Sequence, residues 1–172
     1  SPDGQWVAIT QLDPGTAQDV WLLPVSGKHD RTPLVHGPTR DNGGPISPDG
    51  HWLAYTSDVT GRFQLYVQPF PELGRPLQVS QESASAAWWT RDGRQLVFLG
   101  DDLHSLWRVD VELGGAAPRT GTPKKMATLP SNVVGMDAMP DRQHFLAITP
   151  ERTGISAITI VQNWRAALDK KR

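Results

Sequence analysis

A four-residue turn motif recurs along the chain at a nearly constant spacing. It is complete as S-P-D-G at residues 1–4 and 47–50, and weaker copies follow as T-R-D-G at 90–93 and M-P-D-R at 139–142. Successive copies therefore begin 46, 43 and 49 residues apart. A repeat length in the forties is typical of β-propellers, in which each repeat forms one blade of four strands. The spacing predicts an all-β fold built from propeller blades.

The segments after each motif have the pattern of strands in stacked sheets. Asp-Gly tolerates the positive φ that a tight reversal between two strands requires. A short segment that is apolar on both faces follows each turn, as in strands covered on both sides. These segments are 5–10, 51–56, 94–99 and 143–148. A loop separates each of them from a second apolar run, and these runs are 20–25, 65–70, 106–111 and 158–161.

Weaker signals complete the blades. The candidate inner strands are 44–47, 86–90 and 135–139, and the candidate outer strands are 32–35, 76–80 and 125–129. We therefore predict a β-propeller fragment of about four blades, each a four-stranded antiparallel sheet. The first blade lacks its inner strand and the last blade lacks its outer strand. The approximate blade boundaries are 1–43, 44–85, 86–134 and 135–164, and a polar tail or short helix follows at 165–172.

An incomplete ring leaves blade faces and a strand edge uncovered. Propellers usually contain more blades than this chain supplies, and closure normally hides the edges of their sheets. We expect further blades in the same chain, or a second copy of it, to complete the ring. Within the chain, an aromatic residue recurs at one point of the third strand, as Trp21, Tyr66 and Trp107. We expect all three rings to be buried between blades rather than to bind a ligand.

Composition excludes several classes of partner and site. The chain has 17 Lys and Arg residues against 18 Asp and Glu residues, a net charge of -1. No long-range field attracts nucleic acid or an anionic membrane surface, so neither is a predicted partner. The chain has no cysteine, which excludes disulfides, thiolate nucleophiles and cysteine metal ligands.

The sequence also lacks the known catalytic and cofactor-binding motifs. It contains no nucleophile elbow, P-loop, dinucleotide-binding glycine motif, zinc-protease motif or EF-hand loop. We predict no enzymatic activity and no cofactor for this segment. The histidines do not have ligand spacings, so no metal site is expected. They are His29, His36, His51, His104 and His144.

An aspartate recurs at the third position of every turn motif. These residues are Asp3, Asp49, Asp92 and Asp141. A ring of acids on one face of a propeller could bind a cation. Each aspartate could equally cap its own turn by accepting backbone N–H bonds, and this second interpretation is the one we favour.

The repeat resembles a known family. The pattern S-P-D-G-x-W-[VL]-A-[IY]-T at 1–10 and 47–56 is similar to the WD40-like (PD40) propeller repeats of the TolB family. Two further segments, 66–71 and 158–172, resemble the C-terminal propellers of bacterial Ser/Thr protein kinases and winged-helix regulators. This second resemblance implies a sensory or scaffolding module in a larger signalling protein, with a periplasmic or extracytoplasmic location. The third copy has Thr90 and Arg91 in place of Ser-Pro, the fourth has Arg142 in place of the turn glycine, and we expect looser turns there.

The loops are the best candidates for a binding site, because a rigid scaffold holds them in place. Connections between second and third strands emerge on the same face as the crossovers between blades. The polar residues expected there are Arg40, Asp41, Asn42, Asp58, Arg62, Glu82, Asp101, Asp102 and Arg152. They suit a protein, a peptide or a small polar ligand. The alternatives to a sensory binding module are the gating propeller of a prolyl-oligopeptidase-like peptidase and a TolB-like envelope adaptor.

Overall fold

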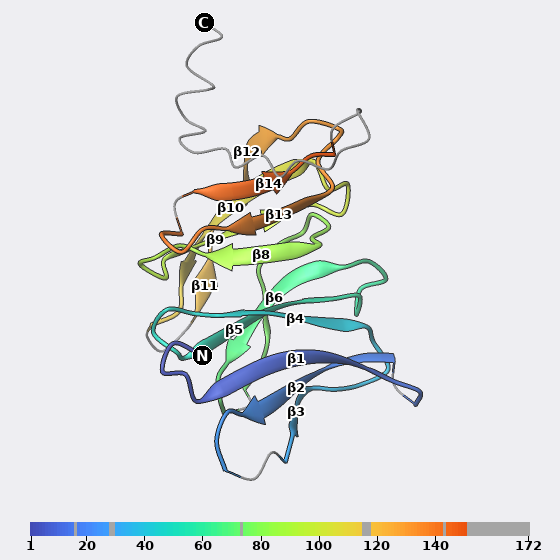
Figure 1. Ribbon diagram of the computed structural model, residues 1–172, viewed down its shortest axis with the longest axis vertical. Helices are drawn as coiled ribbons and strands as arrows, with labels where there is room; N and C mark the ends of the chain where they lie inside the picture. The colour runs from blue at the N-terminus through green and yellow to red at the C-terminus, as the bar shows by residue number, and fades with distance from the viewer. Residues whose placement is uncertain (16, 28–29, 73, 115–117, 143, 151–172) are drawn as a thin grey trace, which may run out of the picture.

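The regular elements in the described part of the chain are all β-strands, and their pairings are antiparallel. The computed structural model describes residues 1–150, except 16, 28–29, 73, 115–117 and 143. Figure 1 shows the sheets following one another along the long axis, from β1–β3 at one end to β13, β14 and the neighbouring β12 toward the other. The predicted architecture, an all-β propeller fragment of about four blades, is confirmed.

Each blade follows the chain outward from the inner strand. Blade 1 contains β1 (Trp6–Asp13), β2 (Ala17–Pro24) and β3 (Thr32–Val35). Blade 2 contains β4 (Asp41–Ile46), β5 (Trp52–Ser57), β6 (Gln64–Pro69) and β7 (Leu77–Gln78). Blade 3 contains β8 (Ala86–Trp89), β9 (Gln95–Leu99), β10 (Ser105–Glu112), β11 (Arg119–Thr120) and β12 (Lys124–Thr128). The described part of blade 4 contains β13 (Gly135–Ala138) and β14 (Phe145–Ile148).

The predicted strand order is confirmed in the first three blades. Blade 1 begins at its second strand, and blades 2 and 3 have inner, second, third and outer strands in that order. The short strand β11 was not predicted, because it pairs through only two residues with the end of β10. The predicted third strand of blade 4, at 158–161, and the tail at 165–172 lie outside the described residues.

Apolar cores between neighbouring blades hold the stack together. Val20 and Leu22 of blade 1 share a core with Leu53, Tyr55 and Tyr66 of blade 2. A second core joins blades 2 and 3, and a third joins blades 3 and 4. Complete burial of a Leu or Val side chain contributes about 1.5–3 kcal/mol, so contacts between blades are a major source of stability.

The outer face of blade 1 is uncovered in the described structure. Val7, Leu53 and Leu96 occupy the same position after the turn motif in three successive blades. Leu53 and Leu96 have no exposed surface, whereas Val7 is 44% exposed. The difference arises because each middle blade packs against the blade before it, and no described residue packs in this way on Val7.

The recurrent aromatic residues lie in equivalent registers. Trp21 pairs with Ile9, Tyr66 with Tyr55, and Trp107 with Phe98 across the second and third strands. The burial prediction is confirmed for Tyr66, which is 7% exposed and stacks on Tyr55 at 5.7 Å. It is only partly right for the two tryptophans, which are half-buried. Trp107 packs against the core of blades 2 and 3, whereas Trp21 shares the uncovered face of Val7.

The turn motifs close alike in all four blades. Gly4, Gly50 and Gly93 have positive φ angles of 69°, 77° and 69°, and Arg142 adopts the same conformation at 52°. The amide of each of these residues donates to the carbonyl at the first position of the motif, at 2.8–3.0 Å. The expectation of looser third and fourth turns is therefore wrong. A left-handed conformation costs a residue other than glycine about 1–2 kcal/mol, so Arg142 is the unusual member.

Candidate functional site

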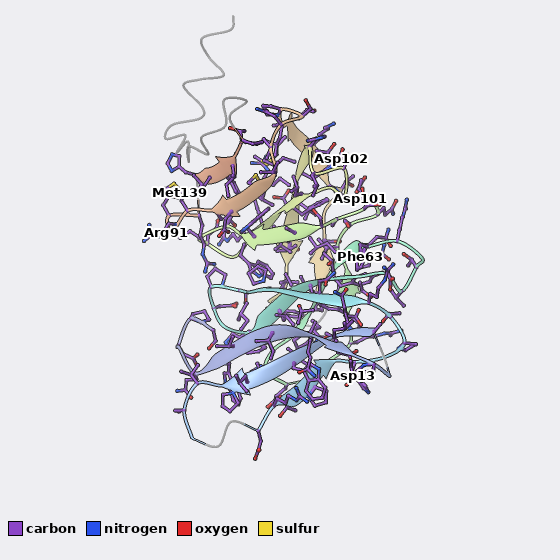
Figure 2. All side chains as sticks on the ribbon, turned by 45° about the vertical axis from the view of Figure 1, so that its right-hand side comes forward. Asp13, Phe63, Arg91, Asp101, Asp102 and Met139 are labelled. Atoms are coloured by element: carbon purple, nitrogen blue, oxygen red, sulfur yellow. The ribbon has the colours of Figure 1, made fainter. Side chains whose placement is uncertain are left out.

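The connections between strands divide into two faces. Figure 2 shows Asp13, Phe63, Asp101 and Asp102 along one side of the molecule, at the loops between second and third strands. We call this side the loop face, and it also bears the crossovers between blades. Arg91 and Met139 lie on the opposite side, which bears the motif turns and is called the turn face.

An anchored arginine is the centre of the loop face. The Arg40 Nε donates to Asp58 Oδ2 at 2.7 Å, and the Arg40 amide donates to Asp58 Oδ1 at 2.8 Å. These hydrogen bonds from the backbone and side chain of Arg40 lower the pKa of Asp58. The Arg40 guanidinium carbon lies 5.1 Å from the centre of the Phe63 ring, a cation–π distance. The crossover into blade 2 is thereby fixed to the following loop of the same blade.

A second arginine extends this surface toward blade 3. The exposed Arg62 donates from Nη2 to the carbonyl oxygen of Gln81 at 2.8 Å. The buried Gln64 donates to the same oxygen at 2.7 Å. We define the loop-face cluster as Arg40, Asp58, Arg62 and Phe63. It combines two positive charges, an acid and an aromatic ring, on loops that hydrogen bonds fix to one another.

Asp41 lies in a different place from the one expected. It is the first residue of β4 and is 1% exposed, so the expectation that it projects from a loop is wrong. Its Oδ2 accepts a hydrogen bond from Thr39 at 2.9 Å, and Oδ1 is buried without a hydrogen-bond partner in the described structure. Burial raises the pKa of Asp41, and the charges of Asp19 and Asp58 add to this effect.

Another buried acid, Asp19, accounts for part of this environment. Asp19 has no exposed surface and accepts a hydrogen bond from the amide of Gly37 at 3.3 Å. Its Oδ2 lies 3.2 Å from Nδ1 of His36, whose side chain is 52% exposed. Sequence analysis missed Asp19, because the apolar run predicted for this strand begins one residue later, at 20–25. The signal available was an acid directly before an apolar run.

The remaining predicted residues do not join the loop-face cluster. Asp102 caps its own loop by accepting from the amides of His104 and Ser105 at 2.8 and 2.7 Å and from the Ser105 hydroxyl at 2.6 Å. These bonds, led by those from Ser105, lower the pKa of Asp102 to about 2. Asp101 is exposed beside it. Asn42 lies within β4, Glu82 has a buried Oε2 without a partner in the described structure, and Arg152 lies outside the described residues.

The recurrent acids of the motif are turn caps, as favoured from the sequence. Asp3, Asp49 and Asp92 each accept a hydrogen bond at 3.1 Å from the amide two residues later. Each also accepts from the hydroxyl at the first position of its motif. Asp141 accepts from the amide of His144 at 3.0 Å. No group of three or more acids and histidines suited to a metal ion occurs in the described part of the chain.

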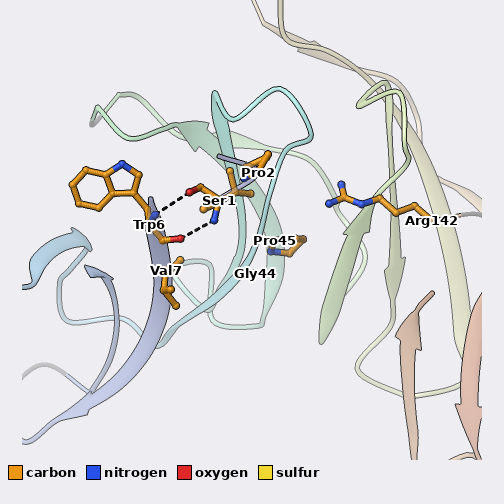
Figure 3. A pocket seen from close by; sticks show the side chains of 9 residues that line it. Ser1, Pro2, Trp6, Val7, Gly44, Pro45 and Arg142 are labelled. Atoms are coloured by element: carbon orange, nitrogen blue, oxygen red, sulfur yellow. Dashed lines mark hydrogen bonds between the residues drawn. The ribbon is translucent and has the colours of Figure 1, made fainter. Parts of the chain in front are cut away.

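A pocket of about 350 Å³ lies between the first two blades near the turn face. β1 supplies Trp6, Val7 and Ala8, and β4 supplies Gly44, Pro45 and Ile46. Figure 3 shows the side chain of Arg142 pointing from blade 4 toward Pro45. The Ser1 amine and hydroxyl are engaged with the backbone of Trp6 at 2.7 and 2.9 Å.

Comparisons with known proteins support the architecture. No protein-family model matches the chain. A putative TolB from Agrobacterium tumefaciens is similar over 74% of this chain and 49% of its own, with a TM-score of 0.53 and 22% sequence identity. TolB from Acinetobacter baumannii is similar over 88% of this chain and 37% of its own, with a TM-score of 0.67 and 16% identity. The chain has a TolB-like propeller fold.

These similarities concern the fold, because the identities are low. The chain spans about half the length of the first TolB structure and 37% of the second. The described residues include no helix that is long and apolar enough to cross a membrane. The function must therefore be inferred from the chemistry of the two faces.

Proposed function

We propose that this TolB-like propeller segment is a non-catalytic binding module, whose loop-face cluster contacts a protein, a peptide or a small polar ligand. The observation that carries the proposal is the anchoring of Arg40. Asp58 accepts a hydrogen bond from Nε of Arg40, and the Phe63 ring packs against one face of its guanidinium group. The two terminal nitrogens of this group make no hydrogen bond to a described residue. A side chain that is already fixed in this way loses less conformational entropy when it binds a ligand than a mobile side chain does.

The chemistry of the cluster suits extended polar ligands. Arg40 and Arg62 are exposed and can donate to carboxylates or peptide carbonyls, and the Phe63 ring beside Arg40 adds apolar surface. Among the described residues of this face, no serine or threonine hydroxyl is hydrogen-bonded to a histidine, and the Ser105 hydroxyl donates to Asp102 as part of a loop cap. Binding is therefore favoured over catalysis. A covalent adduct with a broad serine-hydrolase probe, lost on replacing one serine, would contradict this part of the proposal.

Peptide display on the purified protein tests the binding role. Peptides enriched from a random library should lose most of their affinity for the double variant Arg40→Ala with Arg62→Ala. The control variant Arg94→Ala removes an exposed arginine from the turn face and should bind the same peptides normally. Equal binding to all three proteins, or equal loss in both variants, would exclude the loop-face cluster as the ligand site.

Two of the candidate contexts for the parent protein have a specific observation in their favour. The similarity to two TolB structures favours a TolB-like envelope adaptor. The resemblance at 66–71 and 158–172 favours a sensory module of a bacterial kinase or regulator. The coding sequence on either side of this chain discriminates between them, because a kinase catalytic domain or a winged helix is expected only in the second context.

A further inference from the structure

Two of the departures from the turn motif, Arg91 and Arg142, occupy positions that meet in space in the other blades. A Cβ atom built on Gly50 would lie 4.0 Å from Cδ of Pro2, and one built on Gly93 would lie 3.5 Å from Cδ of Pro48. The fourth position of each turn therefore lies against the second position of the turn before it. In the next pair of turns, these two positions are Arg142 and Arg91.

The structure places both arginines around one pocket. A pocket of about 570 Å³ on the turn face is lined by Thr90, Arg91, Asp92, Gln95 and Arg142. Arg91 is exposed and Arg142 is half-buried. Contacts between proline and glycine in the earlier turns are thus replaced by two cationic side chains from neighbouring blades.

This arrangement is unfavourable unless something else stabilises it. Two like charges that line the same pocket repel each other. Arg142 also has a φ of 52° at a position where the other turns have glycine. Its Nη1 atom is buried and has no hydrogen-bond partner in the described structure. A buried guanidinium nitrogen without an acceptor is costly in free energy.

We propose that this pocket binds an oxyanion, a carboxylate or a phosphoryl group, between Arg91 and Arg142. An oxyanion in this pocket offsets the repulsion between the two positive charges, and it offers an acceptor to the Arg142 guanidinium once that side chain turns from Pro45 toward Arg91. Arginine matches such groups well, because its planar donors can form two parallel hydrogen bonds to them. The site lies on the face opposite the loop-face cluster and is independent of the proposed peptide contact.

The other lining residues do not satisfy the arginines. Oδ1 of Asp92 accepts from the Thr90 hydroxyl at 2.7 Å and from the Arg94 amide at 3.1 Å. No ion pair joins Asp92 to either arginine among the described residues. The side-chain amide of Gln95 donates to Asp110 at 2.6 Å. The two guanidinium groups are therefore the donors left for a ligand, and Asp92 leaves a net positive charge.

The neighbouring pocket of about 350 Å³ is a weaker candidate for the same group. Arg142 lines both pockets, but no second arginine and no lysine is among the residues that line the smaller one. Only the larger pocket brings a second arginine, and the pair is what favours an anion over an uncharged ligand.

Titration of the purified protein with inorganic phosphate and, separately, with succinate tests the proposal. The readout is the shift of arginine side-chain NMR signals. We expect saturable shifts for Arg91 and Arg142 with at least one probe, and the probe that binds more tightly distinguishes a phosphoryl from a carboxylate site. Arg91→Gln and Arg142→Gln should each weaken binding about tenfold or more. Arg94→Gln, in the same turn but outside this pocket, should change it less than twofold.

Restoring the motif glycine gives a test that does not depend on a damaged fold. Arg142→Gly relieves the left-handed backbone, so we expect the thermal midpoint to rise by about 2 °C while probe binding is lost. Absence of saturable shifts with both probes, or equal weakening by Arg94→Gln, would overturn the proposal. Unchanged binding in Arg142→Gly would overturn it as well.

Discussion

The indole nitrogen of Trp89 donates a hydrogen bond to the carbonyl oxygen of Pro45 at 2.9 Å, joining the inner strands of blades 3 and 2. Trp89 is 2% exposed and belongs to the core between these blades. Its neighbour Trp88 has an analogous role on the other side of the strand. The Trp88 indole donates to Asp137 at 2.9 Å, and its ring meets Phe145 edge-on at 5.5 Å. The two adjacent tryptophans thus connect blade 3 to the blades before and after it.

The Trp89→Phe variant should be clearly less stable than the wild type. The smaller ring leaves a cavity and an unpaired carbonyl, which together cost about 2–4 kcal/mol. Urea unfolding followed by circular dichroism measures the change. Trp88→Phe is the matched control, because Trp88 is only half-buried and should cost less. Equal losses in both variants would show that the contact with Pro45 has no special weight.

A methyl group at Gly44 should be poorly tolerated. Gly44 lies within β4, where a Cβ atom would be 2.6 Å from the carbonyl oxygen of Ala54. Relief of this overlap requires the backbone of the paired strand to move, so Gly44→Ala should destabilise the protein by about 2 kcal/mol or more. Gly37→Ala is the control, because no atom lies within 4 Å of its Cβ position and its φ is not in the left-handed region. Thermal unfolding of the two variants checks the difference, and equal midpoints would contradict it.

The sequence was sufficient to predict the blades because the repeat carries local information. The Asp-Gly turns and the apolar strands after them report conformations that neighbouring residues determine, so β5 was placed to within one residue. The outer strand at 32–35 was also placed correctly, from a weaker pattern. The loop-face site was only partly predictable. The sequence placed Arg40 and Asp58 on one face, but their direct contact depends on how a crossover packs against another loop.

Other features required the arrangement of blades in space. Asp41 looked like a loop residue because it lies among glycines and polar residues, yet it begins a strand and faces blade 1. Arg91 and Arg142 were recognised as departures from the motif, but not as neighbours. Their proximity follows from the packing of successive turns, which leaves no pattern within a single repeat.

Loss of the Asp102 cap should destabilise its loop at neutral pH. Asp102→Ala removes three hydrogen bonds to one carboxylate, and we expect a loss of about 1 kcal/mol, a modest value because the group is exposed to solvent. The pKa of Asp102 is lowered from 3.8 to about 2 in the folded state. Its contribution is therefore present above pH 3.8 and is lost as the pH falls toward 2. Urea unfolding at pH 7 and at acidic pH should show the difference between variant and wild type shrinking with acidity. A difference that does not depend on pH would contradict this explanation.

Asp41 should have the opposite effect on the pH dependence of stability. Burial raises the pKa of Asp41 above 3.8 in the folded protein. At a pH between 3.8 and this raised pKa, Asp41 is therefore protonated in the folded state and ionised in the unfolded state. Stability therefore falls as the pH rises from below 3.8 through the folded-state pKa, and the penalty is complete above it. Asp41→Asn cannot titrate, so the unfolding free energy of the wild type should fall relative to that of this variant over the same rise in pH.

A second substitution gives the sign of the effect independently. The Thr39 hydroxyl donates to Asp41 at 2.9 Å and lowers its pKa, so Thr39→Ala should raise that pKa further and extend the fall in stability to higher pH.

The buried apolar residues Ala84 and Val133 occupy the place of Asp41 in the next two blades, six residues before the following turn. An acid at this position is therefore not required by the blade fold. The pH dependence of stability that Asp41 causes arises at the contact between blades 1 and 2. Urea unfolding between pH 3 and 8 checks both variants. Parallel stability curves for the wild type and Asp41→Asn would show that Asp41 does not hold a proton in the folded protein.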